Sequence, residues 1–568
     1  MTAIGNPVLA GCFPDPSVCR VGEWFYLVNS TFEYLPGLPI HRSRDLLHWE
    51  PVGHAVTDQI DLSGLPSSRG LYAPTLRHHD GRFWLVCTAV DAGGHFLLTA
   101  DDAAGPWSDP VWLDGEGIDP SLFFDDDGRI WFHATRPAAD PEWPGQTEIW
   151  LRELVDGALV GPEHVLWTGA LRGAVWAEGP HLYRIDGRYY LLAAEGGTEF
   201  HHAVTVARAD AVTGPYLGDP ANPVLTHRHL GRSVDVAAVG HADLVQAADG
   251  SWWALLLGVR PYGGFHHNLG RETFLVPVTW EDAWPVFAPG QGRVPTTPHV
   301  PTTPTPTPTP TTPALEVGTS APRSTLRHQD PVPNCRPRPR DGGGAPGGGA
   351  PGGGVPGGGG MGGVVGSADL GWCAPRHLPT DLAIPDGDGW LLPVRDTTLA
   401  DTAPSSFLGV RQRHIDCEVV VSVAADLAPG AHGHPSPGDP ATDPALDPAL
   451  DFDTWVGLAV RQSESDHLTL LTNGVETRAT LTRSGRATPL GTGPAGTTLA
   501  LRTHGQDYTL LVDGTEVATA DGRSLDSVSA GGFLGLWIGP YATGRPDRDP
   551  VRVVCHYRPI GRDSAPAG

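Results

Sequence analysis

The sequence predicts an all-β protein, with a five-bladed β-propeller followed by a β-sandwich. The first observation is a short turn followed by an aromatic strand, which recurs five times in the first half of this 568-residue chain. The second is that amphipathic helical periodicity is nearly absent. The third is a stretch rich in Thr, Pro and Gly between two strand-rich regions. Together they predict two folded regions joined by a linker.

The five repeated units define the predicted blades. Each unit has a glycine in its turn, and successive turn glycines are 59, 47, 59 and 63 residues apart. Glycine accepts the positive φ of a tight turn, so Asp-Gly between two apolar runs predicts a hairpin. These glycines are Gly22, Gly81, Gly128, Gly187 and Gly250. Five such units predict a propeller over residues 1–295.

A distinctive residue lies seven to nine residues before each turn glycine. These residues are Asp15, Ala73, Asp119, Glu178 and His241. Equivalent positions on the first strand of each propeller blade converge on the central axis. The alternative is that Asp15 and Asp119 only form turns in their Asp-Pro-Ser sequences, and that Glu178 only caps a strand. Because the pattern recurs in three blades, we expect the three carboxylates and the histidine to share one funnel.

Residues 296–366 are predicted to form a largely disordered linker. Thr/Pro alternation over Thr296–Pro313 favours an extended polyproline II spacer, and the repeated Gly-rich units over Gly342–Gly360 favour flexible coil. Residues 367–568 are predicted to form the β-sandwich, with a loop over Pro429–Leu450. The expected strands are Glu418–Ser422, Val456–Arg461, Leu468–Thr472, Thr498–Leu501, Tyr508–Val512, Gly532–Ile538 and Val551–His556.

Composition excludes several function classes. The net charge of −26 repels phosphate backbones, which argues against a nucleic-acid partner. All 38 cations are arginine, so neither Schiff-base chemistry nor a phosphate-binding GK[ST] loop is available. Seven scattered cysteines without a CxxC spacing argue against a zinc knuckle or a dense disulfide framework. No apolar run approaches the roughly 18 residues of a membrane span. The first twelve residues lack a basic start and an apolar stretch, so we expect a cytoplasmic protein.

Three carboxylates in one funnel are the groups that glycosidic bond cleavage requires. A protonated carboxylic acid donates to the leaving oxygen, and an ionised carboxylate acts on the opposite side of the sugar. In inverting enzymes the two are roughly 6.5–9.5 Å apart, which leaves room for a water molecule. A third carboxylate near the acid raises the acid's pKa by like-charge repulsion.

Several motifs carry a family resemblance. They are FPDPS, LYAPTLRHHDGRFWLV, GIDPSLFFDDDGRIWF, EGPHLYRIDGRYYLLAAEGGTEF, GHADLVQAADGSWW and GRETFLVPVTW. In this order they resemble glycoside hydrolase family 43 over residues 5–293, particularly its β-xylosidase/α-L-arabinofuranosidase branch. PSSFLGVRQRH and GGFLGLWIGPYATG resemble the concanavalin-like β-sandwich that follows the propeller in this branch.

The resemblance implies roles for three carboxylates. Asp15 in FPDPS matches the general base, which activates water against the anomeric carbon. Asp119 in GIDPS matches the carboxylate that orients the acid and tunes its pKa. Glu178 in AEGPH matches the general acid.

The resemblance also implies the sugar-binding residues. Arg271 in GRET matches an arginine that reaches the non-reducing sugar, and Phe32 lies where the family places an apolar wall. Tyr72 stands where relatives often have Trp, which changes that wall. His241 in GHAD matches an axial histidine, which in some relatives helps to hold a central ion, often calcium. The long linker leaves open whether the sandwich completes the pocket.

The expected protein is an inverting, exo-acting glycosidase that removes terminal xylose from xylan-derived oligosaccharides without an organic cofactor. α-L-Arabinofuranosidase or dual activity is the alternative, because both pentoses have a similar outline. A sugar-binding propeller without catalysis is the alternative from another class, but a lectin needs no acid and base pair. The expected partner is a xylo-oligosaccharide or an arabinosylated oligosaccharide. The sequence leaves a structural Ca²⁺ at the axis and homo-oligomer formation open.

Overall fold

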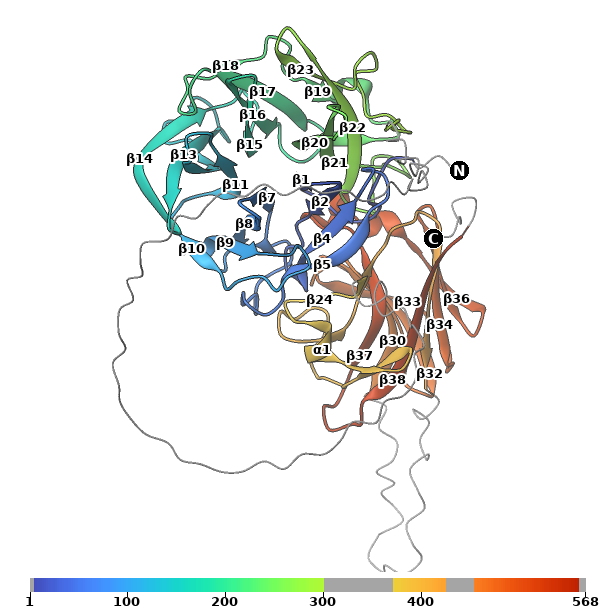
Figure 1. Ribbon diagram of the computed structural model, residues 1–568. Helices are drawn as coiled ribbons and strands as arrows, with labels where there is room; N and C mark the ends of the chain where they lie inside the picture. Colours follow the sequence, from blue (N-terminus) through green and yellow to red (C-terminus); the bar gives the residue numbers. More distant parts are fainter. Residues whose placement is uncertain (1–4, 301–370, 425–453, 561–568) are drawn as a thin grey trace, which may run out of the picture. The chain divides into compact units, whose positions relative to one another are not determined.

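The computed structural model describes residues 5–300, 371–424 and 454–560 (Figure 1). Its regular structure is almost entirely β, which confirms the predicted fold class. The helical elements are short: α1 (Pro379–Leu382), α2 (Ser527–Ala530) and the 3₁₀ turns η1 (Arg228–Leu230) and η4 (Gly522–Ser524). Within the described residues no helix has the length and apolar character needed to cross a bilayer. The predicted loop 429–450 and all of the predicted linker except residues 296–300 lie outside the described residues.

The N-terminal region is the predicted five-bladed propeller, and each blade is an antiparallel sheet. The first three blades are β1 (Ser17–Val21), β2 (Trp24–Val28), β4 (Gly37–Ser43) and β5 (Glu50–Val56); β6 (Gly70–Leu71), β7 (Thr75–His79), β8 (Arg82–Val90), β9 (Gly94–Ala100) and β10 (Val111–Leu113); and β11 (Ile118–Phe124), β12 (Ile130–Pro137), β13 (Thr147–Val155) and β14 (Ala158–Trp167). The last two are β15 (Glu178–Ile185), β16 (Arg188–Glu195), β17 (Ala203–Ala209), β18 (Leu217–Gly218) and β19 (Leu225–Thr226); and β20 (Ala237–Gln246), β21 (Trp252–Val259), β22 (Glu272–Glu281) and β23 (Trp284–Phe287).

The repeated turns join the two innermost strands of every blade. The five turn glycines have φ angles of 61°, 74°, 85°, 80° and 87° in chain order, the left-handed region that glycine enters without steric cost. The inner strands β1, β7, β11, β15 and β20 contact one another in turn, and β20 contacts β1 to close the ring. The start of each inner strand therefore faces the same axis.

The end of the propeller is tied to its beginning. The side-chain amide of Asn6 donates to the carbonyl oxygen of Pro295 at 2.8 Å, and its backbone N–H donates to Thr296 at 2.8 Å. Val300 packs against the apolar cluster that contains Val8 and Phe25. The first residues of the predicted linker thus contact the propeller.

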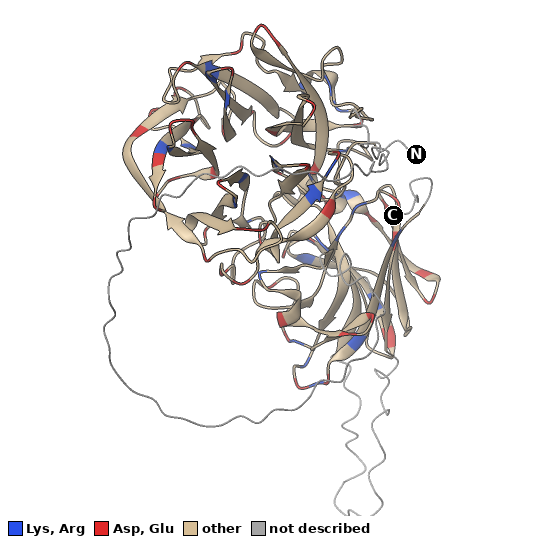
Figure 2. Ribbon diagram, in the orientation of Figure 1, with Lys and Arg blue, Asp and Glu red and all other residues tan. Residues whose placement is uncertain are grey.

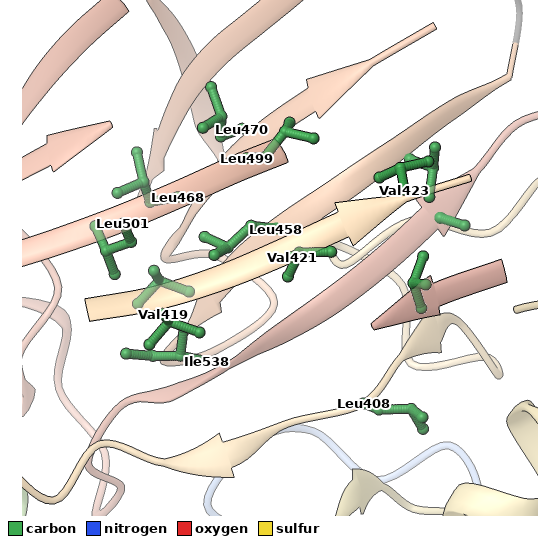
Figure 3. Close-up of a cluster of buried hydrophobic side chains, with 14 of the residues drawn as sticks. Leu408, Val419, Val421, Val423, Leu458, Leu468, Leu470, Leu499, Leu501 and Ile538 are labelled. Atoms are coloured by element: carbon green, nitrogen blue, oxygen red, sulfur yellow. The ribbon is translucent and has the colours of Figure 1, made fainter. Parts of the chain in front are cut away.

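The C-terminal region, residues 371–424 and 454–560, contains two seven-stranded antiparallel sheets. One consists of β25 (Ile384–Asp386), β26 (Gly389–Leu392), β38 (Val551–Pro559), β29 (Cys417–Val423), β34 (Thr498–His504), β35 (Asp507–Val512) and β36 (Thr515–Asp521). The other consists of β27 (Ser406–Phe407), β28 (Val410–Arg411), β37 (Trp537–Thr543), β30 (Trp455–Arg461), β31 (His467–Thr472), β32 (Glu476–Arg483) and β33 (Arg486–Pro494). Both sheets contribute to one apolar cluster, including Val419 and Val421 from β29 and Leu458 from β30 (Figure 3).

One expected strand is wrong. The sequence predicts a strand over Gly532–Ile538, but β37 begins only at Trp537. Gly531 and Gly532 have φ angles of 79° and 78°, which a strand does not accommodate. A Cβ on Gly535 would lie 2.6 Å from the carbonyl oxygen of Leu269, so this backbone packs directly against the propeller. The segment before β37 is a loop that contacts the other region.

The two regions make backbone, polar and charged contacts. Strand β24 (Ala374–Pro375) pairs antiparallel with β3 (Tyr34–Leu35) of the propeller. The Arg411 side chain donates to the carbonyl oxygen of Cys12 at 2.8 Å. Charged positions are dispersed along the described ribbon (Figure 2). One ion pair between the two regions is buried: Arg461 of the C-terminal region lies 3.2 Å from Glu33 of the propeller. The C-terminal region is therefore held by its own interface.

Candidate active site

The inner strands bring the predicted polar residues to one end of the axis. Asp15 lies two residues before β1, Asp119 is the second residue of β11, Glu178 is the first of β15, and His241 lies within β20. Asp15, Asp119 and His241 have φ angles of 52°, 54° and 51°. Non-glycine residues adopt this left-handed conformation uncommonly, and such strain clusters at functional sites. The same conformation in three blades shows that these positions are structurally equivalent.

Asp15 is buried among groups that favour its ionised form. Nη1 of Arg271 donates to Oδ1 at 3.1 Å, and the hydroxyl of Ser30 donates to Oδ2. Nδ1 of His241 lies 3.7 Å from Oδ1. Burial alone raises the pKa of Asp15, but the charges of Arg271 and His241 and the Ser30 hydroxyl outweigh it and hold the pKa below 3.8. Asp15 is therefore a carboxylate at neutral pH.

Asp119 and Glu178 show the opposite electrostatics. The backbone N–H of Gly179 donates to Oδ2 of Asp119 at 3.1 Å, which places Asp119 beside the start of β15. Burial and the nearby charge of Asp15 raise the pKa of Asp119 to about 6, against the opposing charge of His241. Burial and the charges of Asp119 and Asp15 raise the pKa of Glu178 well above 4.5. Carboxyl groups with pKa values pushed apart can serve as an acid and a base at one pH.

Arg271 contacts both a carboxylate of the site and its aromatic side chains. It immediately precedes β22, and its Nη1 also donates to Oγ1 of Thr198 at 3.1 Å. Its guanidinium carbon lies 5.5 Å from the ring centroid of Phe32 and 5.4 Å from that of Phe533. Its Nε is buried and has no hydrogen-bond partner in the described part of the chain. This donor can serve a ligand hydroxyl.

Three aromatic rings form one wall, called here the aromatic wall: Phe32, Tyr72 and Phe533. The Phe32 ring is stacked on Phe533 at a centroid distance of 5.8 Å. Tyr72 meets both edge-on, at 5.4 Å from Phe32 and 5.9 Å from Phe533. Because Phe533 lies in the loop before β37, the C-terminal region supplies one ring of this wall.

The residues on the propeller axis do not fit the central ion that the resemblance implies. The described ranges contain no group of three His, Cys, Asp or Glu side chains that could hold a metal ion. The axis instead holds the guanidinium of Arg77, which bonds Asp243 at 2.8 Å and His181 at 3.0 Å. Ser121 bonds the same His181 nitrogen, and Ser17 donates to Asp243, so all five inner strands contribute to this network. A buried cation of the chain itself thus lies on the axis, paired with a carboxylate and within a network that includes all five inner strands.

Sequence reasoning missed four residues of the site: Ser30, Thr198, Phe533 and Ser68, which contacts the aromatic wall. Thr198 follows two glycines at the end of β16, and this GGT sequence was the only local signal for it. Phe533 lies in a motif that indicated the sandwich but not the pocket. It is 262 residues from Arg271, to whose Nη2 its carbonyl oxygen lies at 3.5 Å, so no local pattern reports the contact.

Known protein families and sequences match this chain over about half of its length. Residues 4–285 match the model of glycosyl hydrolases family 43. The chain is 50% identical over 302 residues to "Xylosidase/arabinosidase" of Butyrivibrio fibrisolvens, covering 52% of this chain and 58% of the relative. It is 45% identical over 287 residues to "Non-reducing end alpha-L-arabinofuranosidase BoGH43B" of Bacteroides ovatus, covering 49% and 52%. These matches thus span little more than half of each curated relative.

Solved structures match over nearly the whole chain. "Bacteroides ovatus Xyloglucan PUL GH43B" is 30% identical with a TM-score of 0.76, covering 98% of this chain and 100% of that one. A xylan β-1,4-xylosidase from Bacillus halodurans C-125 is 27% identical with a TM-score of 0.74, covering 98% and 99%. The propeller, its buried carboxyl groups and these matches lead to one assignment: the chain belongs to glycosyl hydrolases family 43.

Proposed function

We propose that this protein is an inverting exo-glycosidase that removes non-reducing terminal xylose from xylo-oligosaccharides. The observation that carries the proposal is the contrast between the carboxyl groups of one buried site. Asp15 is paired with Arg271 and accepts from Ser30, and its pKa is lowered. Glu178 lies at the start of β15, beside the carboxyl group of Asp119, and its pKa is raised by burial and by the nearby negative charges. Family membership and the names of the relatives, which include "Xylan 1,3-beta-xylosidase" of Vibrio sp and "Beta-xylosidase" of Bacillus subtilis, support the substrate class.

In the proposed reaction a single displacement breaks the glycosidic bond. Asp15 accepts a proton from a water molecule as the water oxygen bonds to the anomeric carbon. Glu178 donates its proton to the glycosidic oxygen, which leaves with the rest of the chain as an alcohol. Water attacks from the side opposite the leaving group, so the anomeric configuration inverts. Asp119 acts through Glu178, because its charge raises the pKa of that acid. The carboxyl groups supply both proton transfers, so the reaction needs no organic cofactor.

The proposed sugar contacts follow from the remaining groups of the pocket. The unpartnered Nε of Arg271 would donate to a sugar hydroxyl. Tyr72 and Phe533 are partly exposed, and their ring surface would pack against the face of a sugar ring. Phe32, which is 2% exposed, packs against both rings and supports them. Nδ1 of His241 lies 3.7 Å from Oδ1 of Asp15, the proposed base. The His241 ring also packs closely against Gly179 in β15, because a Cβ on Gly179 would lie 2.8 Å from that ring. The imidazole therefore lies between Asp15 and the strand that carries Glu178. We assign His241 to the orientation of Asp15 rather than to a metal ion.

α-L-Arabinofuranosidase or dual activity is the second candidate. The observation in its favour is that the two relatives described above carry "arabinosidase" and "alpha-L-arabinofuranosidase" in their names, at 50% and 45% identity.

A panel of nitrophenyl glycosides tests the proposal. We expect kcat/KM on the β-xyloside to exceed that on the α-L-arabinofuranoside, with the Asp15→Ala variant assayed in parallel to exclude a contaminating enzyme. A higher value on the arabinofuranoside would replace the first candidate with the second. Binding of xylose without hydrolysis of either glycoside would identify a sugar-binding propeller and overturn both.

A further inference from the structure

Ser68 makes three hydrogen bonds, two of them to residues of the aromatic wall. It lies in the loop between β5 and β6, is 8% exposed and has a φ of 65°. Its hydroxyl accepts from the backbone N–H of Phe533 at 2.9 Å, and its carbonyl oxygen accepts from the hydroxyl of Tyr72 at 2.9 Å. Its own N–H donates to Oε2 of Glu33 at 2.9 Å. One residue thus contacts two members of the wall and the neighbour of the third, Phe32.

Glu33 fixes the position of Ser68. Its side chain is fully buried, and its other oxygen accepts from Nη1 of Arg461, at the end of β30, at 3.2 Å. The same Nη1 donates to the hydroxyl of Tyr34 at 2.9 Å. A buried ion pair whose remaining atoms are hydrogen-bonded is rigid, because breaking it leaves an uncompensated charge. The N–H of Ser68 is therefore held by a group anchored in both regions.

The loop before β37 is shaped to meet the Ser68 hydroxyl. Gly532 has a φ of 78°, and a Cβ at this position would lie 2.6 Å from Oγ of Ser68. Only glycine allows this approach without displacing the hydroxyl. The approach brings the next residue, Phe533, within hydrogen-bond distance of Ser68 and stacks its ring on Phe32.

We propose that Ser68 is a positioning residue, which holds Phe533 of the C-terminal region in place to complete the aromatic wall. The inference rests on the proposed function in one respect, namely that the wall binds the substrate sugar. Of the three hydrogen bonds, only the bond from Phe533 depends on the serine side chain. Removing the hydroxyl therefore leaves the Phe533 N–H without this acceptor. The backbone bonds of Ser68 to Tyr72 and Glu33 remain, and so does the bond from Gln462 to the carbonyl oxygen of Gly531. In such a variant Phe533 must become ordered when the sugar binds, whereas in the wild type it is already in place. This cost lowers the affinity of the variant for the sugar.

The test compares Ser68→Ala with Ser68→Gly and with Ser529→Ala. Ser529 is exposed in α2, four residues from Phe533, so it controls for loss of a hydroxyl near the same loop. For both Ser68 variants we expect KM on nitrophenyl β-xyloside to rise about five- to tenfold, the equivalent of one ordinary hydrogen bond, with kcat changed less than about twofold. Glycine accepts the left-handed φ at Ser68, so a rise in Ser68→Ala alone would indicate backbone strain and overturn the proposal.

Hydrogen exchange gives a readout that does not depend on activity. In both Ser68 variants, the peptide containing the Phe533 N–H should exchange faster, while peptides from β29 and β34 should match the wild type. Unchanged exchange at Phe533 would overturn the proposal, and so would faster exchange throughout the C-terminal region. Faster exchange at Phe533 with an unchanged KM in an active enzyme would also overturn it. If the wild type hydrolyses no glycoside of the panel, the proposed function fails. Faster exchange at Phe533 alone would then still support the positioning role.

Discussion

The Asp15→Asn variant is expected to lose about 10²–10⁴-fold in kcat on every glycoside that the wild type hydrolyses, the usual contribution of a general base. Asparagine has nearly the same shape, but it cannot accept the proton of the attacking water. The loss should be the same for good and poor leaving groups, because the base acts on the nucleophile. Steady-state kinetics on xylobiose and on nitrophenyl β-xyloside measure it.

A matched control is available in the third blade. Asp125 is also a buried carboxylate, and it accepts from the hydroxyl of Tyr189 at 2.9 Å. Asp119 lies at the start of β11, whereas Asp125 follows the last residue of that strand and is therefore at its opposite end. Asp125→Asn should keep its kcat. An Asp15→Ala variant should regain part of its turnover with azide as external nucleophile, giving a glycosyl azide of inverted configuration. Activity of Asp15→Asn close to that of the wild type would remove Asp15 from the role of base.

The Glu178→Gln variant is expected to show a loss that depends on the leaving group. On xylobiose, whose leaving alcohol needs a proton, kcat should fall by about 10²–10⁴-fold. On nitrophenyl β-xyloside the loss should be much smaller, because nitrophenolate leaves without protonation. Equal losses on both substrates would show that Glu178 does not donate the proton.

The pH profile provides the control for Glu178. Activity requires Asp15 to be ionised and Glu178 to be protonated, so the lowered pKa of Asp15 sets the acidic limb and the raised pKa of Glu178 sets the alkaline limb. Glu178→Gln should lose its alkaline limb on the nitrophenyl substrate. Asp119→Asn removes a like charge, which lowers the pKa of Glu178 and should move the alkaline limb to lower pH. An alkaline limb that does not move in Asp119→Asn would contradict the tuning role of Asp119.

The propeller could be predicted because its signals are local. A glycine with positive φ and an aromatic strand recur in every blade, and in four of the five blades a polar residue precedes the turn at an equivalent place on the ring. The sequence therefore placed Asp15, Asp119, Glu178 and His241 at one axis, and the structure brings them together.

The contacts between the regions could not be predicted in the same way. Phe533 and Ser68 are 465 residues apart, and their bond depends on how two separately folded regions pack. The strand expected over Gly532–Ile538 is wrong at its start, because Gly531 and Gly532 have positive φ and the residues before β37 form a loop that packs against the propeller. The hydrogen-bond network on the propeller axis could not be predicted either. Arg77 bonds Asp243, which is 166 residues away in the sequence, so the position of Arg77 on the axis is visible only in the structure.

The stereochemistry of the product tests the central claim most directly. If ionised Asp15 activates water while Glu178 protonates the leaving oxygen, hydrolysis proceeds by a single displacement with inversion. Proton NMR in the first minutes of hydrolysis of a β-xyloside should then show the anomeric signal of α-xylose, followed by slow mutarotation to the equilibrium mixture. Initial release of β-xylose would contradict the account, because retention requires a covalent glycosyl-enzyme intermediate in which a carboxylate acts as nucleophile.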